Sequence, residues 1–167
     1  MKKLMLLLLV PLLAETQNPG GRWLATSGNV SVTTSYAITV QQPATNASQV
    51  YVDQAVAYCS AACTVQAFAN GTAATTTAGT VIPLLPTPLN TIAPFTFWTA
   101  SNVGTGTAQS GILNLPAGAT SPTLCFTPSC GNPTQVSLGT GGTSANFTIL
   151  VTMATGTANV ALYLRSQ

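Results

Sequence analysis

The sequence predicts an all-β fold, a single β-sandwich or jelly roll of about eight to ten antiparallel strands. Short segments alternate apolar and polar residues with a period of two, which is typical of half-buried strands. Gly- and Pro-containing turn sequences separate these segments, and no stretch after the N-terminal block has a helical period. About 150 residues after that block suffice for one hydrophobic core, so we expect a single domain over residues 29–167.

The first fourteen residues have the pattern of a secretory signal peptide. Lys2 and Lys3 precede an apolar block of about ten residues, which is shorter than the about 20 needed to span a bilayer. Cleavage after Ala14 would give a secreted, periplasmic or cell-surface protein with no membrane span in the mature chain. The alternative is an uncleaved N-terminal helix or membrane tether. Residues 15–28 are expected to form a flexible leader.

Five segments carry the strand alternation most clearly, and they cover residues 35–40, 50–58, 64–70, 145–153 and 159–164. In the second of these, the pattern places Val50, Val52, Val56 and Tyr58 on one face, with Gln54 among them. Short turn-like connections predict two hairpins. One would pair 50–58 with 64–70, and the other would pair 145–153 with 159–164 at the end of the chain.

The middle of the chain has a different pattern. Residues 81–94 hold four prolines among leucines and isoleucines. Since proline cannot donate a hydrogen bond to a sheet, this segment cannot be a central strand. We expect it to be an extended apolar crossover along the body of the domain. Residues 103–115 offer one further strand.

Four cysteines occur as two close pairs, Cys59 with Cys63 and Cys125 with Cys130. In an exported chain an even number of cysteines predicts disulfides, and a tight turn brings the members of each local pair within bonding reach. The alternative is a metal site made of four thiolates, whose spacing these pairs roughly satisfy. The oxidising compartment argues against that site, so no metal and no cofactor is expected.

Charged residues are nearly absent. The chain has four Lys and Arg residues, two Asp and Glu residues and no His, so that 4% of it is charged, against roughly 25% in an ordinary domain. After signal cleavage, Arg22 and Arg165 would balance Glu15 and Asp53. Nucleic acid is excluded as a partner because phosphate binding needs several basic residues in one footprint. Near-zero net charge instead favours self-association.

The residue types needed for catalysis are largely missing, so we expect no enzyme and no catalytic residue. A serine nucleophile needs a base such as His or Lys, and glycoside hydrolysis needs two carboxylates. Asp53 is the one carboxylate well inside the mature chain. It is expected to be solvated or to pair with Arg22 or Arg165.

Two tryptophans are the candidate ligand-binding side chains. Trp23 and Trp98 could stack on a sugar ring, because aromatic faces combined with Thr, Asn and Gln groups suit a neutral glycan. Packing in the core is the alternative for Trp98, and for Trp23 the alternatives are a docking side chain and the anchor of an N-terminal strand.

Residues 50–164 resemble small exported or phage-associated jelly-roll or β-sandwich proteins of unknown function. The segments that carry the likeness are VYVDQA, NGTAAT, TASNVGTGTA and NFTILVTMATGTANVALYLR. The resemblance implies a single structural unit of a surface or virion and transfers no functional residue. Fimbrial subunits are a second likeness, in which residues 29–33 would complement the sheet edge of a neighbour.

These observations together predict an exported, non-catalytic structural or surface-interaction and assembly subunit. Its partner would be a second copy or a component of a surface. The alternative is a carbohydrate-binding module for neutral glycans.

Overall fold

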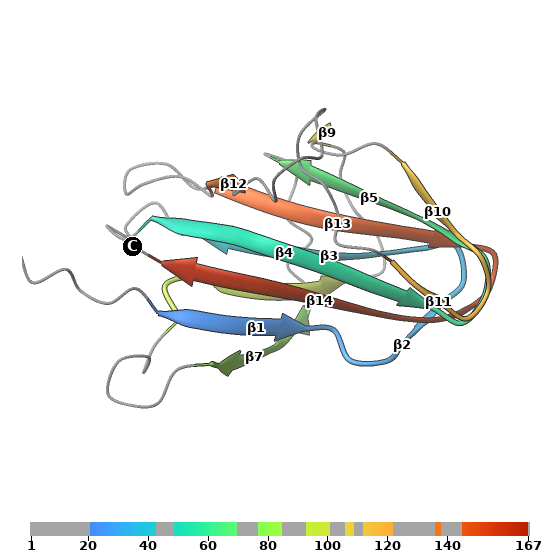
Figure 1. Ribbon diagram of the computed structural model, residues 1–167, viewed down its shortest axis with the longest axis horizontal. Helices are drawn as coiled ribbons and strands as arrows, with labels where there is room; N and C mark the ends of the chain where they lie inside the picture. The colour runs from blue at the N-terminus through green and yellow to red at the C-terminus, as the bar shows by residue number, and fades with distance from the viewer. Residues whose placement is uncertain are drawn as a thin grey trace, which may run out of the picture.

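A computed structural model of the chain describes residues 21–42, 49–69, 77–84, 93–100, 106–108, 112–121, 136–137 and 145–166. This part is all-β and consists of two seven-stranded antiparallel sheets, the arrangement of a β-sandwich (Figure 1). The predicted fold class is therefore confirmed at this level. Fourteen strands are present in the described residues, several of only two residues, against the eight to ten expected. The signal-peptide residues 1–14 lie outside the described part.

Sheet A has long strands at its centre and short ones at its edges. Its order is β11 (Ala119–Thr120), β4 (Val50–Cys59), β14 (Gly156–Ser166), β1 (Arg22–Thr26) and β7 (Thr80–Pro83). Two short strands extend it, β12 (Val136–Ser137) beside β4 and β2 (Val30–Val32) beside β14.

Sheet B is built in the same way around β13. Its order is β10 (Leu113–Leu115), β5 (Cys63–Ala69), β13 (Ala145–Met153), β3 (Ser35–Gln42), β8 (Thr96–Ala100) and β6 (Thr77–Ala78), with β9 (Thr107–Ala108) beside β5. Within the predicted strand over 103–115, the described residues include β9 and β10, and residues 103–105 and 109–111 lie outside the described part. The five clearest predicted strands are confirmed as β3, β4, β5, β13 and β14.

Both predicted hairpins are wrong, because each pair of consecutive strands is divided between the two sheets. β4 pairs with β14 in sheet A, and β5 pairs with β13 in sheet B. The chain therefore arches twice from one sheet to the other at the same end of the sandwich (Figure 1). Alternation shows that each strand has one apolar face. It does not show whether two consecutive strands lie side by side in one sheet or face each other in two sheets.

The expected flexible leader contains a core strand. β1 hydrogen-bonds to β14 on one side and to β7 on the other, and Trp23 and Ala25 are buried. Residues 15–20 lie outside the described part. β2, within the segment considered as a donor strand, pairs with β14 of its own chain. These pairings make residues 22–32 part of the sandwich rather than a linker.

The proline-rich segment begins as a strand at the edge of sheet A. Residues 80–83 form β7, where Pro83 is tolerated because an edge strand has one unpaired side. Gly79 lies between β6 of sheet B and β7 of sheet A, so the chain changes sheets there. A methyl group at Gly79 would overlap the Phe97 ring. Residues 85–92 of the predicted crossover lie outside the described part.

The core fills the space between the sheets with the inward side chains of the central strands. Phe147, Ile149, Val151 and Met153 of β13 are all buried, as the alternation predicts. Trp23 of β1 meets Phe95 edge-on, with ring centroids 5.5 Å apart, a favoured geometry for two aromatic rings. The two sheets are therefore joined by aromatic as well as aliphatic packing.

Candidate functional site

A β-bulge in β4 decides which of its side chains face outward. Val52 is opposite Leu164, but Gln54 is opposite Tyr163, so Asp53 is an extra residue in the register. Beyond the bulge Ala55 and Ala57 point inward and are buried, whereas Val56 is half-buried and Tyr58 is 38% exposed. The prediction that Val56 and Tyr58 share the inward face of Val50 and Val52 is wrong. An inserted residue shifts the alternation by one position, and a pattern with a period of two does not reveal the insertion.

The bulge brings Asp53 to Arg165, which lies on β14. The Arg165 Nε donates to Asp53 Oδ1 at 2.8 Å, and the Arg165 guanidinium lies over the Tyr51 ring, 4.5 Å from its centroid. Arg22 is the cross-strand neighbour of Arg165. Of the two alternatives expected for Asp53, a solvated residue or a partner of Arg22 or Arg165, the structure shows the pair with Arg165. The three charged residues of the described part all lie at this end of sheet A.

An apolar row crosses sheet A beside these charges. Following the strand register across the sheet, the row consists of Gln54 of β4, Tyr163 of β14, Leu24 of β1 and Ile82 of β7. Tyr163 is 38% exposed and Ile82 is 43% exposed, and Leu84 next to the row is 45% exposed. An exposed apolar patch of this kind, rimmed by polar groups, is typical of an interaction surface.

We call this surface the outer face of sheet A, and it has two unlike ends. Arg22, Arg165 and Asp53 occupy one end, and Tyr58 with Asn159 occupies the other. The residues of the face, from β4 to β7 and Leu84, are Tyr51, Asp53, Gln54, Val56, Tyr58, Asn159, Ala161, Tyr163, Arg165, Arg22, Leu24, Thr26, Thr80, Ile82 and Leu84.

The outer face of sheet B is different in character. One row consists of Phe68, Thr148, Thr39 and Trp98, on β5, β13, β3 and β8. Both threonines are buried, and their Oγ1 atoms are hydrogen-bonded at 2.9 Å. The aromatic side chains on either side are half-buried. No charged residue of the described part lies on this face, which combines aromatic rings with hydroxyl groups.

The two candidate tryptophans have different surroundings. Trp23 is 3% exposed and lies against Phe95, so it cannot serve as a surface platform, and that prediction is wrong. The chain orients it inward because β1 is paired on both sides within sheet A. Trp98 lies on the outer face of sheet B, where its Nε1 donates to Thr96 Oγ1 at 3.1 Å. Only Trp98 therefore keeps a partly accessible ring.

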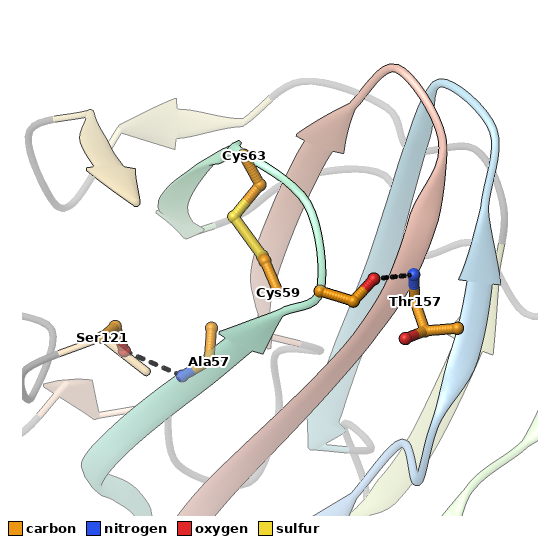
Figure 2. The surroundings of a disulfide bond; sticks show 6 residues. Ala57, Cys59, Cys63, Ser121 and Thr157 are labelled. Carbon is orange, nitrogen blue, oxygen red and sulfur yellow. Dashed lines mark hydrogen bonds between the residues drawn. A yellow bond between two sulfur atoms is a disulfide. The ribbon is translucent and has the colours of Figure 1, made fainter. Parts of the chain in front are cut away.

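Cys59 and Cys63 form a disulfide across the first arch (Figure 2). Both side chains are buried, and the Cα atoms are 6.4 Å apart. Because β4 and β5 belong to different sheets, this bond joins sheet A to sheet B. The predicted local pairing is confirmed for these two cysteines, which removes them from the proposed four-thiolate metal site. Cys125 and Cys130 lie outside the described residues.

Hydrogen bonds fix the disulfide arch to its neighbours (Figure 2). The Thr157 N–H donates to Ser60 Oγ at 2.7 Å, and the Ser60 N–H donates to the Thr157 carbonyl at 2.9 Å. On the other side of β4, the Ala57 N–H donates to Ser121 Oγ at 2.8 Å. These contacts hold the two arches together, so the Tyr58 end of the outer face of sheet A rests on a fixed backbone.

The described residues hold no group of three or more His, Cys, Asp or Glu side chains that could bind a metal ion. Within the same residues no helix is long and apolar enough to cross a membrane. Burial raises the pKa of the Tyr36 phenol, which faces the core, while the nearby Thr99 side chain acts in the opposite direction.

The apolar residues of the outer face of sheet A were not predicted as a site. The sequence nevertheless indicates them, because the large side chain of Tyr163 occupies an outward position between the inward-facing Leu162 and Leu164. Leu24 has the same relation to Trp23 and Ala25. Large apolar residues at outward positions of a strand indicate a second covered face, provided that the inward face is known.

No protein-family model matches the chain, and no curated protein or solved structure is significantly similar to it.

Proposed function

We propose that the protein is an exported, non-catalytic surface-interaction or assembly subunit that binds its partner through the outer face of sheet A. The observation that carries the proposal is the exposure of Tyr163, Ile82 and Leu84 on one side of a sandwich whose core is already filled by other side chains. Exposed apolar area of this kind costs free energy in water, and a bound partner would remove that cost.

The composition supports the non-catalytic part of the proposal. The whole sequence lacks His, and its two acidic residues are Glu15 and Asp53. Asp53 is engaged by Arg165, so it does not offer a free base. The same scarcity of charge weakens long-range steering, so binding would rest on contact of apolar surfaces. Export rests on the N-terminal pattern of residues 1–14.

A pair of matched variants tests this function in cells that secrete the protein. Ile82→Lys places a charge on the outer face of sheet A, whereas Ile112→Lys makes the same change at a 63% exposed position beside β10 of sheet B. Native size exclusion of the exported fraction, concentrated to about 1 mM, should give a complex larger than the monomer for wild type and for Ile112→Lys. Ile82→Lys should give the monomer.

Two results would contradict the proposal. The first is a wild-type chain that stays in the cytoplasm. The second is a complex whose size is the same for Ile82→Lys as for wild type. Ile82 and Ile112 are both exposed, so each variant should have the denaturation midpoint of wild type. Equal midpoints would exclude a folding defect.

A second candidate function is binding of neutral glycans by the outer face of sheet B. The observation that favours it is the partly accessible Trp98, on a face that holds no charged residue of the described part. Retention of the purified protein on cellulose, chitin or xylan, lost in Trp98→Ala and kept in Ile82→Lys, is the expected result. Wild-type protein that passes all three matrices unretained would eliminate this function.

A further inference from the structure

We propose that the occupant of the outer face of sheet A is the same face of a second copy, related by a two-fold axis that runs across the strands. This inference rests on the proposed function, which it makes specific by naming the partner. In such a dimer each strand lies over the same strand of the second copy. Each end of the face on one copy meets the opposite end of the face on the other copy.

The charges of the face are compatible with a second copy. The described residues of the face hold two arginines and one aspartate, with Arg165 Nε and Asp53 Oδ1 2.8 Å apart, so its formal charge is only +1. A strongly charged partner has little to bind at such a surface. A nearly neutral chain also has weak repulsion between its own copies, which favours self-association.

The unlike ends of the face select the orientation of the two-fold axis. With the axis parallel to the strands, the end that holds Arg22 and Arg165 would meet the same two arginines of the second copy. With the axis across the strands, it meets the Tyr58 end instead. Arg165 already lies 4.5 Å from the Tyr51 centroid in its own chain, so arginine on tyrosine is a contact that this surface makes.

The size of the face determines how tight the dimer can be. From Tyr51 to Tyr58, which lie opposite Arg165 and Asn159, it extends about 20 Å along the strands, and its four strands cover about 19 Å, which gives a footprint of about 400 Å². A standard stable interface buries roughly 800 Å² on each partner. We therefore expect a reversible dimer. The average molar mass in solution should rise from that of the monomer to that of the dimer as the protein concentration increases from about 10 μM to 1 mM.

Sedimentation equilibrium of the oxidised, exported chain tests the dimer and its geometry. Tyr58→Glu should lower the dimer Kd about five-fold, because both symmetric contacts would then bring a carboxylate to the arginine end. Tyr58→Lys should raise the Kd by a similar factor. Ile82→Lys should raise it at least ten-fold, and Ile112→Lys should leave it unchanged.

Salt provides the second readout. The tightening by Tyr58→Glu should disappear at about 0.5 M NaCl, since contacts between exposed charges are screened. If Tyr58→Glu fails to fold, the exchange variant Arg22→Glu/Tyr58→Lys replaces it. That variant should dimerise more tightly than either of its single substitutions.

The outcomes that overturn the inference differ from those that overturn the proposed function. A purified chain that stays monomeric up to about 1 mM removes the second copy as partner. If Ile82→Lys still abolishes the complex from secreting cells, the proposed function stands with another partner. A dimer that Tyr58→Glu weakens has its axis along the strands and refutes the geometry. A dimer that Ile82→Lys leaves unchanged uses another surface.

Discussion

Substituting the buried threonine pair of sheet B would test whether the hydroxyls on its outer face stabilise the fold. Thr39 and Thr148 are 1% and 0% exposed, and their Oγ1 atoms lie 2.9 Å apart. Thr148→Val keeps the side-chain shape but leaves the Thr39 hydroxyl buried without this partner, which costs about 1–3 kcal/mol. The added methyl group recovers about 0.8 kcal/mol. Each single substitution should therefore lower the free energy of unfolding by about 0.2–2.2 kcal/mol.

The double variant Thr39→Val/Thr148→Val should behave differently. It loses one hydrogen bond, worth about 0.5–1.5 kcal/mol, and gains two buried methyl groups worth about 1.6 kcal/mol. Its stability should thus lie within about 1 kcal/mol of wild type, well above the sum of the single effects. Guanidinium unfolding of the oxidised protein measures all four species, provided that the m-values agree.

The control for this cycle is Thr152→Val on the same strand. Thr152 is exposed, so its replacement should change stability by less than about 0.5 kcal/mol. If the effects of Thr39→Val and Thr148→Val add to within about 0.5 kcal/mol in the double variant, the two hydroxyls are not coupled and the reasoning is refuted.

Four further predictions concern the stability of the fold. Gly79→Ala should cost about 1–3 kcal/mol, because the new methyl overlaps the Phe97 ring, and Phe97→Leu in the same chain should recover part of the loss in a denaturant titration. Cys59→Ala/Cys63→Ala should cost about 2 kcal/mol, as expected for a short closed loop, and an unchanged unfolding midpoint would contradict this. Stability should vary little between about pH 5 and 9, since the chain has no His. Above about pH 10 the unfolded Tyr36 ionises while burial raises the pKa of the folded one, so stability should fall with rising pH, and Tyr36→Phe should reduce that slope.

Much of the local structure could be predicted from residue patterns alone. In β13 and β14 every inward position carries a small or large apolar residue, and these strands occur within three residues of their predicted bounds. The Cys59–Cys63 bond was also predictable, because a turn of three residues between two cysteines brings their Cα atoms within bonding distance.

The candidate site was much less predictable. Asp53 was expected to pair with an arginine, and it does, but the bulge that aims its side chain at Arg165 depends on the pairing of β4 with β14. The apolar row formed by Leu24, Tyr163 and Ile82 comes from three segments far apart in the chain. Such a row exists only once the register of sheet A is set.

The sequence by itself determined that this chain is all-β, has a local disulfide between Cys59 and Cys63, and has almost no charge and few residues suited to catalysis, because composition and a period of two are properties of single segments. Only the tertiary structure decided that consecutive strands arch between sheets, that the leader holds a core strand and that Trp23 is buried. Each of these depends on which strands pair, and pairing is set by the burial of distant segments against one another.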